Sequence, residues 1–253
     1  MATVVRYPGE PWWRGLSLLG FVAVWQIAAI LLGEALLPSP TQVIAALWQY
    51  LVSGELLYHL GITLARVAVS FLVAMAIGTA IGILMGRSER VDHVLDGLLV
   101  LGLNIPALVT IIVCYIWFGL TEVAAITAVA LNKIPTVVVT VREGARAIDR
   151  SLLEVAQTYR VPRGRTLTKV YLPQLYPYLM AAARSGLALI WKIVLVVELL
   201  GRSNGVGFQL GTLFQFFDIT GILAYTLAFA GVILFLEAAL IRPLERRMTR
   251  WRG

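Results

Sequence analysis

The chain has 253 residues, of which 59% are hydrophobic and 14% charged, and its formal net charge is +7 at pH 7. A soluble domain carries about 25% charged residues, so this composition excludes an ordinary soluble domain and indicates a membrane protein with several spans. The basic residues gather in the polar segments between apolar runs, a pattern that argues against a nucleic-acid-binding face.

The first apolar run covers residues 16–35, and no cleavage site for a secretory signal precedes it, so we expect a retained membrane span. Residues 41–52 have helical apolar spacing and predict a helix that lies along the outer membrane surface. A second span covers 61–85. Gly78 and Gly82 in this span, with Gly86 just after it, recur at intervals of four, which predicts close approach of a neighbouring helix unless the helix merely tolerates glycine.

The third span, residues 94–120, contains Asn104 and Pro106, so we expect a helix that is kinked or broken near the membrane centre. The fourth span, residues 123–141, holds Lys133 next to an asparagine and two residues before a proline. Such an irregular stretch can open a polar pocket within a bundle of helices.

A fifth span covers residues 175–200, and a sixth covers 222–241 and leads into a basic tail. Between them, residues 201–220 predict an outer segment with a short re-entrant helix. With six spans, sixteen of the 21 Lys and Arg residues fall on the side of the two termini; Arg202 stands opposite, and the other four lie within spans. This asymmetry predicts cytoplasmic termini.

The polar interruption at residues 142–173 is too charged to lie in lipid, although about 20 apolar residues flank it on each side. Asp149 or Ser151 is the expected N-cap of a short amphipathic helix, and Glu154 follows Ser151 at the spacing of a capping box. Pro162 and Gly164 break this helix, and a second short helix is expected at 166–171, ending at Pro173.

The first of these short helices has an apolar face on a loop that should lie in water. An exposed apolar patch of this kind usually marks a surface for a partner protein. The residues of this face are Leu152, Val155, Ala156 and Tyr159.

Glu154-Val155-Ala156, followed by Leu172-Pro173, resembles the "EAA" loop of the membrane subunits of ABC importers. Further short motifs over roughly residues 36 to 252 are similar to the nitrate, sulfonate and taurine branch of that family. They are Leu37-Pro38-Ser39-Pro40, Thr63-Leu64-Ala65-Arg66, Asn104-Ile105-Pro106, Trp117-Phe118-Gly119, Glu198-Leu199-Leu200 and Arg246-Arg247-Met248-Thr249-Arg250-Trp251.

The resemblance implies an all-α, six-span fold of the type I importer permeases, as a single domain over residues 1–253, in the bacterial cytoplasmic membrane. In such importers the loop docks in a groove of a cytoplasmic ATPase. The family has glycine six residues after the glutamate, where this chain has Arg160, so the bend lies either there or at Arg163-Gly164. The implied coupling residues are Leu152, Glu154, Val155, Ala156, Tyr159, Arg160, Pro162, Gly164, Leu172 and Pro173.

The implied partners are two ATPase chains, a second permease copy in a homodimer, and a binding protein that delivers a small, sulfonate-like anion. An aromatic acid or a vitamin precursor is the alternative substrate within the same branch. None of the three lysines is followed by Ser or Thr, so the chain lacks a phosphate-binding P-loop. We therefore expect no cofactor on this chain, with ATP and Mg on the ATPase.

Ionisable side chains at membrane depth cost about 2.5–3.5 kcal/mol each when they face lipid, so they should face protein, water or a partner. Lys133 and Asn104 are expected to line the translocation path; a buried Lys133 paired inside the bundle is the alternative. Arg66 and Glu198 could instead form an ion pair, and Arg184 and Glu237 should snorkel to the cytoplasmic side. The candidate path residues are Asn104, Pro106, Lys133, Lys192, Glu198 and Arg66.

Two other classes of protein fit the sequence less well. A secondary transporter would need inverted repeats, and no internal repeat is evident. A membrane-embedded enzyme would need converging nucleophile, base or metal ligands. The two histidines, His59 and His93, fall on opposite membrane faces in this topology, so no metal site is expected and we predict a transport subunit that is not an enzyme.

Overall fold

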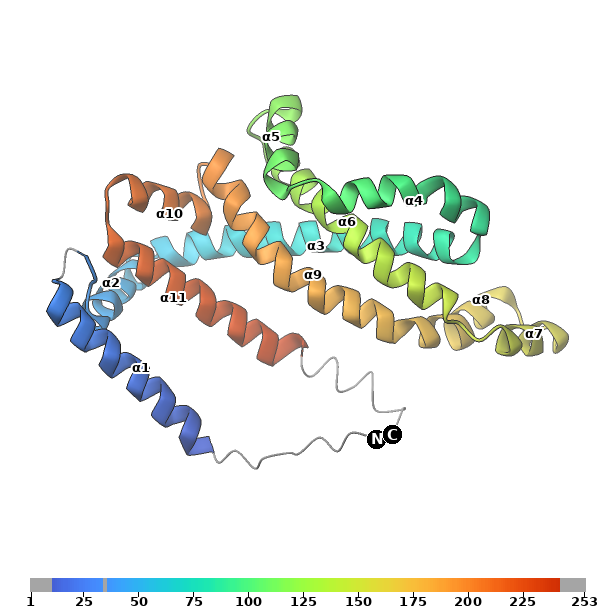
Figure 1. Ribbon diagram of the computed structural model, residues 1–253, viewed down its shortest axis with the longest axis horizontal. Helices are drawn as coiled ribbons and strands as arrows, with labels where there is room; N and C mark the ends of the chain where they lie inside the picture. Colours follow the sequence, from blue (N-terminus) through green and yellow to red (C-terminus); the bar gives the residue numbers. More distant parts are fainter. Residues whose placement is uncertain (1–10, 34–35, 242–253) are drawn as a thin grey trace.

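The computed structural model of the protein describes residues 11–33 and 36–241, and all the regular structure in this part of the chain is helical (Figure 1). The elements in chain order are α1 (Pro11–Leu32), α2 (Pro40–Val52), α3 (Glu55–Arg87), α4 (Glu89–Asn104), α5 (Ala107–Phe118), α6 (Glu122–Arg146), α7 (Arg150–Thr158), α8 (Arg163–Thr166), the π-helical η1 (Leu167–Tyr171), α9 (Leu172–Gly201), α10 (Val206–Gln215), α11 (Ile219–Leu236) and the π-helical η2 (Glu237–Ile241).

Five helical stretches in the described residues are long and apolar enough to cross a membrane, and they contain α1, α3, α6, α9 and α11. The pair of α4 and α5 passes the same test together, which gives six spans if the pair counts as one. The all-α, six-span architecture expected from the sequence is therefore confirmed. The basic tail and the first ten residues lie outside the described part of the chain.

The expected break in the third span is present, and it is sharp, because α4 and α5 meet at 99°. Ile105 has an extended backbone (φ −72°, ψ 123°), as expected for a residue that precedes proline. Pro106 follows as the N-cap of α5 and has no backbone N–H to continue the hydrogen bonding of α4. In Figure 1, α5 consequently projects away from the long axes of α3 and α4.

Helices α3, α6 and α9 form the centre of the molecule, and the glycine pattern of α3 explains how closely α6 approaches it (Figure 1). A Cβ atom added at Gly78 would lie 2.7 Å from the Cβ of Val137, and one at Gly82 would lie 2.8 Å from the Cβ of Val141. At Gly86 the added atom would lie 2.5 Å from the Cβ of Ala145. The prediction of close helix packing along this face is confirmed.

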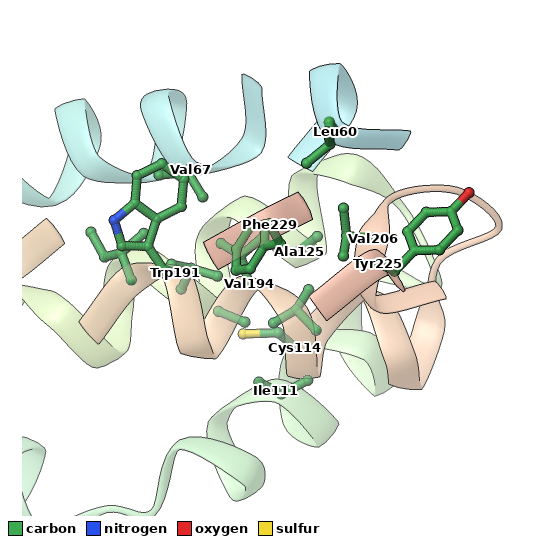
Figure 2. Packing of buried hydrophobic residues seen from close by; sticks show 14 of the residues in the cluster. Leu60, Val67, Ile111, Cys114, Ala125, Trp191, Val194, Val206, Tyr225 and Phe229 are labelled. Atoms are coloured by element: carbon green, nitrogen blue, oxygen red, sulfur yellow. The ribbon is translucent and has the colours of Figure 1, made fainter. Parts of the chain in front are cut away.

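A large apolar cluster fills the space between α3, α5, α6, α9 and α11 (Figure 2). Trp191 and Phe229 pack edge to face, with ring centroids 5.9 Å apart and an interplanar angle of 78°. The only cysteine, Cys114, is buried in the same cluster. This ring pair is a contact between α9 and α11, and both α2 and the outer segment are helical as expected.

Candidate functional site

The first part of the polar loop folds as helix α7, and Asp149 is its N-cap. The Asp149 carboxylate accepts hydrogen bonds from the backbone N–H of Ser151 at 2.9 Å and from its hydroxyl at 2.5 Å. These bonds lower the pKa of the Asp149 carboxyl from its usual value, the side-chain bond most. Ser151 is therefore not the cap, and Glu154 is an exposed side chain in the middle of α7 instead of the second member of a capping box.

The apolar face of α7 is divided between solvent and the body of the protein. The side chains of Leu152, Val155 and Tyr159 are 49%, 52% and 79% exposed, so they form a free apolar surface. Ala156 is only 6% exposed and does not belong to that surface, which corrects the expected face. Leu153 packs on the buried cluster around Tyr171 and attaches α7 to the spans.

Helix α7 ends in a Schellman motif whose left-handed residue is Arg160, with φ +52°. The N–H of Arg160 donates to the carbonyl of Gln157, and the N–H of Val161 donates to that of Ala156 at 2.9 Å. Gly164 lies inside α8 and is not the bend. Of the two positions left open by the sequence, the chain bends at Arg160, and it accepts a backbone conformation that glycine would adopt more easily.

The second helix of the loop does not end at Pro173, contrary to expectation. It begins at Arg163 and continues without interruption through η1 into α9. In η1 the N–H of Leu172 bonds to the carbonyl of Leu167, five residues back. This wider turn lets the helix pass Pro173, which has no N–H to donate, and joins the loop directly to the fifth span.

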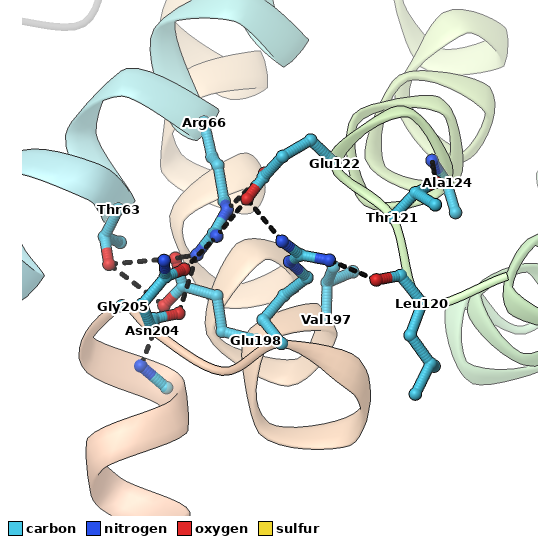
Figure 3. Close-up of polar contacts among 12 residues, drawn as sticks. Thr63, Arg66, Leu120, Thr121, Glu122, Ala124, Val197, Glu198, Asn204 and Gly205 are labelled. Carbon is cyan, nitrogen blue, oxygen red and sulfur yellow. Dashed lines mark hydrogen bonds and ion pairs between the residues drawn. The ribbon is translucent and has the colours of Figure 1, made fainter.

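At the other end of α9, Arg66 and Glu198 form a buried ion pair at 2.8 Å (Figure 3). The Arg66 guanidinium also binds the Glu122 carboxylate through two bonds of 2.6 and 2.8 Å, and donates to Asn204. Glu198 is fully buried and accepts from the hydroxyl of Thr63 at 2.9 Å. We call Thr63, Arg66, Glu122, Glu198 and Asn204 the Arg66 cluster.

The Arg66 cluster joins α3, α6 and α9 to the loop that precedes α10. The N–H of Gly207 donates to Glu198 at 2.8 Å, and the N–H of Gly205 donates to His59 at 3.0 Å. A side chain on either glycine would collide with Glu198, and Gly205 also has φ +106°. The sequence suggested an Arg66–Glu198 pair, but nothing in it pointed to Glu122 or Asn204.

Lys133 and Asn104 are not brought together. Lys133 is 2% exposed, and its Cε lies 3.1 Å from a Cβ built on Gly186 of α9. Its amine makes no hydrogen bond within the described part of the chain. Asn104 is exposed at the bend, where its amide donates back to the carbonyl of Val100 at 2.7 Å. A carboxylate or carbonyl partner for Lys133, the alternative account, is not among the contacts of the described residues.

Arg184 and Glu237 approach each other, with 4.0 Å between a guanidinium nitrogen and a carboxylate oxygen, and their snorkelling stays a prediction. They lie at one end of a groove between α9 and α11, and Lys192 lies in the same groove. No group of three or more His, Cys, Asp or Glu side chains that could hold a metal ion occurs among residues 11–33 and 36–241.

Comparison with known proteins gives a consistent result. The family described as "Binding-protein-dependent transport system inner membrane component" matches residues 78–250. The chain is 33% identical to the aliphatic sulfonates transport permease protein SsuC of Bacillus subtilis (strain 168), with 99% of this chain and 92% of that protein covered. It is 29% identical to the taurine transport system permease protein TauC of Escherichia coli (strain K12), with 90% and 85% covered.

The fold is that of solved importer subunits. A structure of inward facing conformations of the MetNI methionine ABC transporter superposes with a TM-score of 0.59 at 20% sequence identity. The superposition covers 76% of this chain and 93% of that chain.

Proposed function

Because the chain belongs to the family of binding-protein-dependent transport system inner membrane components, we propose that it imports a small sulfonate-like anion. As a membrane-spanning permease of an ABC importer it is a transport subunit, and a separate ATPase and a solute-binding protein are its partners. The names of the relatives, which concern aliphatic sulfonates and taurine, support the substrate class.

The exposed apolar face of α7 is the observation that carries the proposed coupling to the ATPase. Leu152, Val155 and Tyr159 present apolar surface from a loop that is otherwise polar, and such surface favours burial against a partner. Glu154 and Arg160 add charges beside it, and the bend at Arg160 sets the angle between α7 and α8. The remaining proposed coupling residues are Ala156, Pro162, Gly164, Leu172 and Pro173, which shape and support this surface.

The full importer would contain two copies of this chain and two ATPase chains, which bind ATP and Mg. Orientation by the positive-inside rule puts the loop and both termini in the cytoplasm of a bacterial cell, with the chain in the inner membrane. Closure of the ATPases would then rock the spans between inward-open and outward-open forms.

The six path residues stay predictions, and their surroundings are of three kinds. Arg66 and Glu198 neutralise each other in the Arg66 cluster, which supports a role in holding the outer loop. Lys133 is enclosed between helices, while Asn104, Pro106 and Lys192 lie on or near exposed surfaces. A substrate would reach Lys133 only after α3, α6 and α9 separate.

The proposal is tested by ATP hydrolysis and uptake in proteoliposomes that contain this chain, the ATPase co-expressed with it and the cognate binding protein. We expect hydrolysis to rise when the binding protein is loaded with taurine or an alkanesulfonate. The Glu154→Ala and Tyr159→Asp variants of α7 should abolish this stimulation. Arg90→Gln, an exposed change on α4 outside the loop, is the matched control and should behave as the unmodified protein.

A chain that retains no ATPase, or an ATPase that hydrolyses equally with and without the loaded binding protein, would refute the coupling proposal. Stimulation by an aromatic acid or a vitamin precursor, but by no sulfonate, would keep the importer and reject the substrate class.

A further inference from the structure

The groove between α9 and α11 has a volume of about 350 Å³ and combines cationic side chains with apolar walls. Trp191 and Phe229, packed edge to face, line it and are themselves 6% and 7% exposed (Figure 2). Leu187 and Ile233 extend the apolar lining. Arg184 and Lys192, two turns apart on α9, supply the positive charges.

The depth of Lys192 determines what this groove faces. Lys192 is exposed in the isolated chain and lies nine residues, or about 14 Å, from the end of α9 at Gly201. The opposite end, Leu172, is about 30 Å away. An exposed amine at such a depth would cost about 2.5–3.5 kcal/mol if it faced lipid. This face of α9 therefore borders a water-filled path or a second copy of the chain.

The distribution of charge in the groove favours a ligand with a single negative charge. Glu237 approaches Arg184 to 4.0 Å at the end of the groove nearer α8, so these two charges offset each other. Lys192 makes no ion pair within the described residues and leaves one positive charge. A ligand that matched the groove would place an anionic head at Lys192 and a short apolar body against Trp191 and Phe229.

We propose that the groove of Arg184, Trp191, Lys192, Phe229 and Glu237 is a binding site in the wall of the translocation path for an organic monoanion with a short apolar body. The inference rests on the proposed function and narrows its substrate to alkyl or aryl sulfonates over inorganic anions. An inorganic anion has no apolar part that could contact Trp191 and Phe229. Anionic phospholipids also combine an anionic head with an apolar chain. The experiment must therefore distinguish an organic sulfonate from a phospholipid as the ligand of the groove.

The test is equilibrium binding of radiolabelled hexanesulfonate to the purified complex of permease and ATPase in phosphatidylcholine nanodiscs, without ATP or binding protein. Lys192→Gln should weaken binding about tenfold, the loss expected for one hydrogen-bonded charge, whereas Lys192→Arg should retain it. Ala188→Trp should block the groove without changing its charge, because Ala188 lines it. Unlabelled sulfate should compete far more weakly than unlabelled hexanesulfonate.

Arg90→Gln, which removes a positive charge from exposed surface on α4, is the control and should bind hexanesulfonate as the unmodified complex does. Co-purification of the ATPase with each variant checks that the permease is folded. Equal binding by the unmodified, Lys192→Gln and Ala188→Trp complexes would overturn the inference. Displacement of hexanesulfonate by phosphatidylglycerol added to the nanodiscs would also overturn it, and would identify a lipid site.

These outcomes are independent of the proposed function, because binding requires neither ATP hydrolysis nor the binding protein. Loss of uptake with intact, Lys192-dependent hexanesulfonate binding would count against the proposed coupling alone. Normal coupled hydrolysis with binding that is insensitive to Lys192 would count against the groove alone.

Discussion

Arg160 has a left-handed backbone conformation that is typical of glycine. Its φ of +52° closes the Schellman motif of α7, and both hydrogen bonds of that motif are formed. A non-glycine residue in this conformation costs about 1–2 kcal/mol relative to right-handed helix. Pro162, two residues later, restricts the chain further and helps to hold the bend.

Replacing Arg160 by glycine should therefore stabilise the end of α7, by up to about 1 kcal/mol after the larger loss of glycine entropy is counted. Hydrogen exchange of the amides at positions 160 and 161, which bond to Gln157 and Ala156, should slow. Arg160→Ala removes the same charged side chain but keeps the strained φ, so it should give no such protection. Equal protection in both variants would attribute the effect to charge instead of backbone conformation.

Arg66 and Glu198 should show strong thermodynamic coupling. Removing one partner of a buried ion pair costs about 3–5 kcal/mol, since the other charge remains buried. We expect Arg66→Ala, which leaves the buried Glu198 carboxylate without a cation, to lower the thermal stability of the solubilised protein severely. Glu198→Ala should lower it less, because Arg66 keeps Glu122 as a partner. The double variant should lose much less than the sum. Additive losses would show that the two charges do not depend on each other.

The matched control is the Arg142–Asp96 pair at the other end of the spans, 2.7 Å long but with Asp96 52% exposed. Asp96→Ala should change stability by about 0–1 kcal/mol, as the loss of an exposed ion pair does, because Arg142 keeps Asp92 and Glu143 as partners.

Sequence reasoning identified the Arg66–Glu198 pair because charges at membrane depth need partners. It could not supply the other members of the cluster. Glu122 falls between the predicted third and fourth spans, and Asn204 lies in a loop with no periodic pattern. Each meets Arg66 only through tertiary packing, across 56 and 138 residues of chain. Asp149 was named with Ser151 as a possible cap, and only the side-chain geometry chooses between them.

At the scale of elements, the contact between α3 and α6 depends on the absence of side chains at three positions of α3. Gly82→Leu should prevent this contact, because even its Cβ would lie 2.8 Å from Val141 and 2.9 Å from a carbonyl oxygen of α6. We expect loss of the folded, ATPase-binding complex, measured by size-exclusion chromatography and co-purification.

Gly61→Ala on the same helix is the control, because a Cβ at Gly61 has no heavy atom within 4 Å. Alanine there should be neutral or stabilise the helix by about 0.5–1 kcal/mol. A Gly82→Leu variant that folded and bound the ATPase normally would mean that α6 can move away from α3 without consequence.

Most of the helices could be predicted because lipid requires long apolar runs, and these are visible in a sequence. The errors concern places where backbone hydrogen bonding departs from the α pattern. Pro173 was expected to end a helix, yet the π turn of η1 carries the chain past it. The break at Pro106 was expected, but its 99° angle depends on the backbone angles at the break, which the residue types alone do not fix. Ala156 was assigned to the free face because α7 was considered without its neighbours.

At the scale of the whole molecule, the proposed orientation predicts which ends of the spans are accessible from outside the cell. Cys114 is buried, so it should react little with a membrane-impermeant maleimide. On intact cells, Phe216→Cys after α10 should be labelled and Arg90→Cys at the start of α4 should be protected. Permeabilised cells should label both, which controls for reactivity. The reverse pattern on intact cells would invert the orientation.

The uninterrupted helix from Arg163 to Gly201 has a mechanical consequence. Its 39 residues make a lever arm about 58 Å long, with one end at the bend after α7 and the other beside Glu198. Because Glu198 is held by the Arg66 cluster, the far end cannot swing without carrying the loop before α10 and the start of α3. A tilt of about 5° about the Arg163 end would move the end beside Glu198 by about 5 Å, so a small rotation at one membrane face becomes a displacement of several ångströms at the other.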